Sequence, residues 1–112
     1  MTQHGTLKVK FTATYSEVEE IDIDADELEE HIVVQLSSLG DVETSYEESD
    51  GEIEFKGILR MDGERTYHPA TMYEPADEEI SVSVAAWELK ELLQLGTKQP
   101  FVSISEEEWE AA

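Results

Sequence analysis

Residues 41–61, DVETSYEESDGEIEFKGILRM, consist of two alternating segments joined by Asp50-Gly51. An Asp-Gly pair between alternating segments is a strong signal for a two-residue hairpin turn. The second segment, 52–61, is apolar or glycine at every second position, which predicts a strand with one buried face. The first, 41–49, alternates more weakly and predicts a second strand. Gly57 inside the pattern predicts either a bulge or the close approach of a helix.

The segment before this hairpin has helical periodicity. Large aliphatic residues recur at positions i, i+4, i+8 and i+11 as Leu28, Ile32, Leu36 and Leu39. Asp24 followed by Glu27 has the spacing of a capping box, in which the two residues satisfy free N–H groups at a helix start. Gly40 stands where a left-handed C-terminal cap is expected. We therefore predict a helix over residues 25–39.

Two further segments near the N-terminus alternate. Residues 7–15 place apolar side chains at odd positions and Lys8, Lys10, Thr12 and Thr14 between them. Residues 18–24 repeat the two-residue period, with acidic residues on one face. These segments predict a hairpin in which the two lysines face the second strand's carboxylates.

The C-terminal half contains shorter elements. Asp62-Gly63 predicts a turn that returns residues 64–68 as another strand, followed by a loop over 69–79. Alternation over 80–84 predicts a short strand, and the apolar residues of 85–93 predict a helix closed by Gly96. Residues 101–104 predict an edge strand. Ser105 with Glu108 has capping-box spacing and predicts a short terminal helix carrying Trp109.

These elements together predict one α+β domain. Its expected fold is a mainly antiparallel sheet of about five to six strands with two helices packed on one face. At 112 residues the chain is long enough to bury a modest core, and 39% of its residues are hydrophobic. That composition argues against a wholly disordered acidic tail.

The charge is the most unusual property of the chain. Asp and Glu number 28 against seven Lys and Arg, which gives a formal net charge of -21. Anionic membrane surfaces would repel such a protein, and no apolar run is long enough to span a bilayer. The N-terminus lacks the features of a secretory signal, so we expect a cytoplasmic protein. Without cysteine, no disulfide or thiolate metal site is expected.

Motifs of catalysis and metal binding are missing from the sequence. It has no Gly-rich phosphate loop, HExxH or GxSxG, so we expect neither an enzyme nor a cofactor. Asp22, Asp24 and Asp26 resemble the opening of a calcium loop. The sixth loop position, however, is Glu27 instead of the required glycine, so no dedicated metal site is expected. His31 is expected to be a structural or flanking residue of the helix.

Two windows of 14 residues carry many carboxylates and no Lys or Arg. Residues 17–30 contain nine: Glu17, Glu19, Glu20, Asp22, Asp24, Asp26, Glu27, Glu29 and Glu30. Residues 41–54 contain seven: Asp41, Glu43, Glu47, Glu48, Asp50, Glu52 and Glu54. A solvated surface usually mixes both signs of charge. One-signed windows therefore indicate a surface directed at a basic, nucleic-acid-binding protein.

In size, composition and clustered carboxylates, the chain resembles the small phage-encoded DNA-mimic inhibitors of the anti-restriction and anti-CRISPR type. This resemblance implies a protein that occupies the DNA-binding groove of a host defence enzyme in the host cytoplasm, without itself binding nucleic acid. The class shares no fold, so no residue role is transferred. We expect the carboxylates of 17–30 and 41–54 to contact the partner, except Asp41. We expect a third cluster, Glu106, Glu107, Glu108 and Glu110, to matter less because a terminal segment is poorly held.

Two other interpretations remain open from the sequence. One is an immunity protein or antitoxin that neutralises a basic nuclease. The other is a small salt-adapted protein whose acidity has no partner. In the latter case we would expect more Asp, whereas Glu outnumbers Asp by 21 to 7. The sequence leaves the oligomeric state open between monomer and homodimer.

Overall fold

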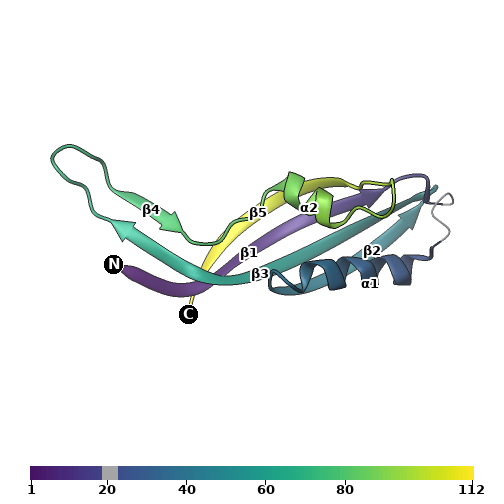
Figure 1. The fold of residues 1–112 in the computed structure, drawn as a ribbon, viewed down its shortest axis with the longest axis horizontal. Helices are drawn as coiled ribbons and strands as arrows, with labels where there is room; N and C mark the ends of the chain where they lie inside the picture. The colour runs from purple at the N-terminus through teal and green to yellow at the C-terminus, as the bar shows by residue number, and fades with distance from the viewer. Residues whose placement is uncertain (19–22) are drawn as a thin grey trace.

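The computed structural model describes residues 1–18 and 23–112 and contains two helices and a five-stranded antiparallel sheet (Figure 1). The predicted α+β fold with a mainly antiparallel sheet is therefore confirmed. The sheet has the order β2-β3-β1-β5, and β4 pairs with β3 outside this path. The elements are β1 (Thr2–Tyr15), α1 (Ala25–Leu36), β2 (Asp41–Ser49), β3 (Glu52–His68), β4 (Asp77–Ile80), α2 (Ala86–Leu92) and β5 (Phe101–Ala111).

The core lies between one face of the sheet and the two helices. Alternate residues of β1 and β3 are buried there, and α1 adds Leu28, Ile32 and Leu36 while α2 adds Leu89. The Tyr15 hydroxyl donates a hydrogen bond to the carbonyl of Leu93, which links the end of β1 to the end of α2. Burial raises the pKa of this tyrosine. The opposite face of the sheet, which we call the open face, is not covered by either helix (Figure 1).

The Asp50-Gly51 hairpin and the start of α1 form as predicted. Asp50 and Gly51 both have positive φ, 41° and 81°, which is the geometry that a two-residue hairpin with the sheet's twist requires. Asp24 accepts a hydrogen bond from the backbone N–H of Glu27 at 2.9 Å. The α1 helix ends at Leu36, earlier than the predicted Leu39.

Two glycines have roles other than those predicted. A Cβ on Gly40 would lie 2.0 Å from the carbonyl oxygen of Arg60, so this glycine allows the chain to pass close to β3 and is not a left-handed cap. A Cβ on Gly57 would lie 2.2 Å from the ring of Phe11. Pairing of β3 with β1 and β2 continues through Gly57 without a register shift, so this glycine does not mark a bulge. The group that lies close to Gly57 is the Phe11 ring of β1 and not a helix.

The predicted hairpin between 7–15 and 18–24 is wrong. Residues 19–22 of that second segment lie outside the described residues. Both edges of β1 are already occupied, because β1 pairs with β3 over Thr2–Tyr15 and with β5 over Gly5–Thr14. Lys8 and Lys10 therefore face Glu108 and Glu106 of β5 on that side.

The predicted turn at Asp62-Gly63 is also wrong. These residues pair with Thr6 and Gly5, and β3 continues straight through them to His68. Long-range pairing with β1 overrides the local turn preference. The chain instead reverses over 69–76, and β4 begins at Asp77, earlier than the strand predicted over 80–84.

The predicted terminal helix is a strand. Residues 101–111 form β5, in which Glu106 pairs with Lys10 and Glu108 with Lys8. Ser105 does not cap a helix but donates to the carbonyl of Lys10 at 3.2 Å, beside an irregularity in the ladder. Pairing along β1 and an ion pair of 3.2 Å between Lys10 and Glu106 together outweigh local helix preference.

The molecule is elongated, with extents of 60 × 26 × 21 Å. Both helices lie over one half of its length, and β4 with the outer ends of β1 and β3 projects from the other half (Figure 1). Within the described residues, no helix combines the length and apolarity needed to cross a membrane.

Replacement of Gly57 tests the packing of β1 on β3. Gly57→Ala should lower the free energy of unfolding by about 1–3 kcal/mol, because the new methyl group overpacks against the buried Phe11 ring. Urea denaturation at fixed salt measures the change. Ser45→Ala, at an exposed site on the paired strand β2, is the control and should change stability by less than about 0.5 kcal/mol. Equal stabilities for the two variants would contradict this packing.

Candidate functional site

The two acidic windows meet at one end of the molecule, because α1 begins beside the turn that joins β2 to β3 (Figure 1). The Tyr46 hydroxyl on β2 donates a hydrogen bond of 2.6 Å to Asp26 Oδ1 on α1. The backbone N–H of Val18 donates to the carbonyl of Gly51 at 3.0 Å. These contacts hold the start of α1 and the β2–β3 turn in one arrangement.

The chemistry around Tyr46 reflects a strongly negative environment. The hydrogen bond to Asp26, partial burial and the nearby charges of Asp26, Glu48 and Glu29 raise the pKa of Tyr46 to about 12. Each of these causes opposes a further negative charge on the phenolic oxygen. Carboxylates of both windows therefore act on a single side chain.

Strand β2 is an outer strand of the sheet, and carboxylates flank it on both faces. Glu48 lies on the helix side, where it lines a hollow beside α1. Glu47 pairs with Glu54 of β3, which lies on the open face because its neighbours Ile53 and Phe55 are buried. We define the acidic edge as Asp24, Asp26, Glu27, Glu29, Glu30, Glu47, Glu48, Asp50, Glu52 and Glu54.

The side chains of the acidic edge are accessible. All of them are exposed except that of Glu29, which is half-buried. Among the described residues, four carboxylates form ion pairs with Lys or Arg and two more lie 3.6 Å from a His nitrogen, and none of these six belongs to the acidic edge. The negative charge of this edge is therefore not neutralised by a salt bridge in the described part of the protein.

The basic residues are concentrated elsewhere. No Lys or Arg occurs between residues 17 and 54. Four of the seven bases, Lys8, Lys10, Lys56 and Arg60, lie along the two central strands on the open face. Lys10 pairs with Glu106 at 3.2 Å and Arg60 with Glu43 at 3.5 Å. Two of these four cations thus link a central strand to an outer strand of the sheet.

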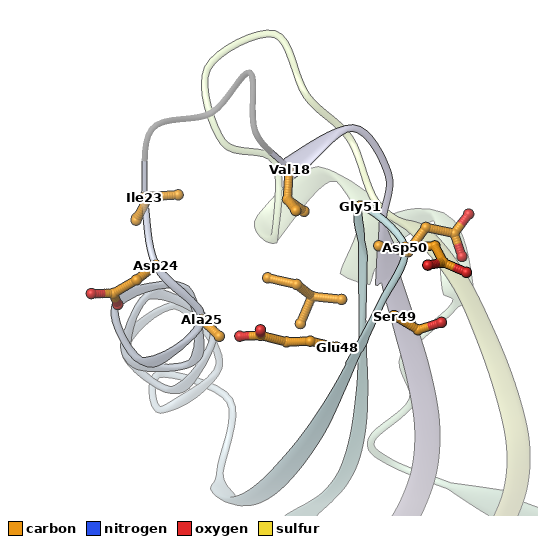
Figure 2. Close-up of a pocket in the computed structure, with 10 residues that line it drawn as sticks. Val18, Ile23, Asp24, Ala25, Glu48, Ser49, Asp50 and Gly51 are labelled. Carbon is orange, nitrogen blue, oxygen red and sulfur yellow. The ribbon is translucent and has the colours of Figure 1, made fainter.

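A hollow of about 560 Å³ lies between the start of α1 and the β2–β3 turn (Figure 2). Apolar side chains, Val18, Ile23, Ala25 and Ile53, alternate around it with acidic ones. Figure 2 shows the Glu48 side chain reaching toward Ala25, whereas the carboxylate of Asp24 points away from the hollow. The carboxylates of Asp24 and Glu48 therefore point in different directions and do not converge on one point. Across residues 1–18 and 23–112, no three His, Asp or Glu side chains are grouped so that they could hold a metal ion.

The structure divides the predicted contact residues into three groups. Ten form the acidic edge. Two have cationic neighbours instead: Glu17 lies 2.9 Å from Lys98, and Glu43 pairs with Arg60. Glu19, Glu20 and Asp22 lie outside the described residues.

Neither the role of Tyr46 nor the position of the terminal carboxylates is apparent from the sequence. Tyr46 belongs only to a weak alternation there, although it is the one aromatic residue among the carboxylates of 41–54. The terminal cluster was expected to be poorly held, but Glu106, Glu107 and Glu108 are paired along β1. Glu106 is neutralised by Lys10, and that pairing gives a different reason to expect a minor role in binding.

Comparison with known proteins gives no relative for this chain: no family model matches it, and no curated protein or solved structure is significantly similar to it.

Repulsion within the acidic edge has a measurable cost. Glu47 and Glu54 are directly opposite across β2 and β3, and like charges in that position destabilise a sheet. Glu54→Lys should raise the free energy of unfolding by a few tenths to about 1 kcal/mol at low salt. Screening should remove most of this gain in high salt. Glu91→Lys, at an exposed position of α2, changes the net charge equally and should gain less. Equal gains from the two variants would mean that only net charge matters.

The environment of Tyr46 should be visible in an alkaline titration. Phenolate absorbance should show a tyrosine with a midpoint near the raised pKa of about 12, and Tyr46→Phe should remove that step. Asp26→Asn should lower the midpoint toward 10, because it removes the acceptor charge. The raised pKa stabilises the fold below pH 10, and this contribution is lost as the pH rises from about 10 to about 12. An unchanged Tyr46 midpoint in Asp26→Asn would contradict the contact.

Proposed function

We propose that this protein is a DNA-mimic inhibitor, which inserts its acidic edge into the nucleic-acid-binding groove of a host defence protein of the restriction or CRISPR type. One observation carries the proposal: carboxylates from two base-free windows stand together and unneutralised, joined by the bond between Tyr46 and Asp26. The resemblance in composition to phage-encoded mimics supports the same conclusion.

The spacing of the carboxylates suits this role. Neighbouring strands of a sheet lie about 4.8 Å apart, and same-face residues two apart along a strand lie about 6.6 Å apart. Phosphates of one DNA strand rise about 3.4 Å per nucleotide along the axis and lie farther apart along their path. Glu47 with Glu54, and Asp26 with Glu29 or Glu30, therefore present negative charge at separations of the same order as a nucleic acid.

Preorganisation supports the proposal further. Exposed carboxylates on flexible segments would lose entropy on ordering against a partner. Here α1 and the β2–β3 hairpin fix the backbone of the carboxylates before binding. Arg and Lys side chains of the target would exchange phosphate oxygens for carboxylate oxygens as hydrogen-bond acceptors. The inhibitor performs no covalent chemistry, uses no cofactor and acts in the cytoplasm where its target works.

Charge reversal on the acidic edge tests the proposal. Glu27→Lys, Glu29→Lys and Glu30→Lys together should abolish binding to the target, because they place cations against its basic groove and leave the Tyr46–Asp26 hydrogen bond intact. The α1 core residues Leu28 and Ile32 are unchanged, so the fold should persist by circular dichroism. The measurement is a pull-down from a defence-proficient lysate, followed by displacement of the captured protein with duplex DNA. Binding should weaken steeply as salt rises.

The matched control is Glu74→Lys, Glu91→Lys and Glu107→Lys, which makes the same change in net charge at exposed positions away from the acidic edge. This variant should retain most of the binding. If both variants bind equally well, the acidity serves solubility and the mimic proposal is wrong. A captured nuclease that DNA fails to displace would instead indicate an immunity protein that binds beside the nucleic-acid groove.

A further inference from the structure

The half of the molecule opposite the acidic edge is a sheet with no second layer. We define the arm as Met1, residues 2–4 of β1, residues 62–68 of β3 and all of β4 (Figure 1). No residue of the arm is buried. Both helices lie over the other half of the sheet (Figure 1). Three strands with an uncovered face are marginal in water, because a sheet is normally stabilised by packing that face against another layer.

One face of the arm continues the apolar face of the core. Alternation along β3 puts Arg65 and Tyr67 on the same side as the buried Leu59 and Met61. The strand pairing adds Gln3 opposite Arg65, Ile80 opposite Arg65 and Glu78 opposite Tyr67. Met1 lies beside Tyr67, whose backbone N–H donates to the Met1 carbonyl at 2.8 Å. We define the arm face as Met1, Gln3, Arg65, Tyr67, Glu78 and Ile80.

The arm face combines exposed apolar groups with balanced charge. Met1 is 89% exposed, Tyr67 41% and Ile80 39%. Several of its members line a shallow groove of about 460 Å³. Arg65 Nη2 pairs with Glu78 Oε1, so the side-chain charges of this face cancel. On a protein with a net charge of -21, a face whose side-chain charges cancel is a place where a second copy can approach without strong local repulsion.

We propose that two copies of this chain form a homodimer through their arm faces. A two-fold interface brings the same patch together from both subunits, so the patch must complement itself. The arm face satisfies this condition because Arg65 of one copy can meet Glu78 of the other while Tyr67 and Ile80 pack between them. Joining the arms also places the two acidic edges at opposite ends of the dimer, which keeps their repulsion small. The proposal does not depend on the identity of any basic partner.

The first test is the mass of the unmodified protein in solution. Analytical ultracentrifugation in physiological and in higher salt should give twice the 12.7 kDa of one chain. Higher salt should favour the dimer, because screening weakens the repulsion between the acidic edges. A chain that stays monomeric up to millimolar concentration in both salts overturns the proposal.

Paired charge insertions locate the interface. Tyr67→Glu with Ile80→Glu should weaken dimerisation by at least about tenfold, since buried unpaired charges are costly at an interface. Met72→Glu with Tyr73→Glu adds the same charges at two exposed apolar residues of the connection between β3 and β4, outside the arm face, and should leave the dimer intact. A dimer that survives both changes forms elsewhere and overturns the proposal.

A mixing experiment remains decisive even if the inserted charges disturb folding. Arg65→Glu and Glu78→Arg should each be monomeric alone, because each places like charges across the two-fold interface. An equimolar mixture of the two variants should form a heterodimer. In it, the two substituted side chains have opposite charges and face each other, and the unchanged Glu78 of one chain faces the unchanged Arg65 of the other. A mixture that stays monomeric, although both variants fold by circular dichroism, overturns the proposal.

Discussion

The pairing of β1 with β3 over fourteen residues, from Thr2 opposite Thr66 to Tyr15 opposite Ile53, is the interaction on which the rest of the structure depends. Its uninterrupted register puts every second residue of both strands on the core face, where α1 and α2 pack. It also carries β3 past the point where a local turn signal would have ended it. The same ladder therefore supports the core at one end and the arm at the other, and fixes which face of the sheet receives each charged residue.

Positive and negative side chains are concentrated in different parts of this protein. The central strands β1 and β3 hold four bases on the open face, and two of these form ion pairs with carboxylates of the outer strands. Lys10 and Arg60 are thus committed within the sheet. What remains at the acidic edge is negative charge alone, displayed by a helix and a hairpin that Tyr46 links to each other. This separation gives the proposed mimic a defined binding surface, which net charge by itself would not.

Local patterns predicted the elements whose signals lie close together in the sequence. The capped start of α1 and the Asp50-Gly51 turn depend on contacts within a few residues, and both form as expected. The errors at Asp62-Gly63 and at residues 105–108 share a cause: pairing with a strand distant in the sequence overrode a local preference. Likewise, the sequence identified the carboxylates of the candidate site. It could not show that Arg60 neutralises Glu43 or that Tyr46 joins the two windows, because both depend on the register of distant strands.

The outer strands of the sheet have a further property in common. β2, β4 and β5 each leave one edge without a partner strand in the described chain, and each is rich in carboxylates, including Glu43 and Glu47, Asp77 to Glu79, and Glu106 to Glu108. Unpaired strand edges are templates for aggregation, and charge along an edge is a recognised protection against it. The acidic side chains thus also oppose edge-to-edge association between copies of this protein, whose strand content is 53%. Strong acid would protonate these carboxylates and remove the protection at all three edges together. Fibre formation through the strand edges is therefore the form of aggregation that we expect at low pH.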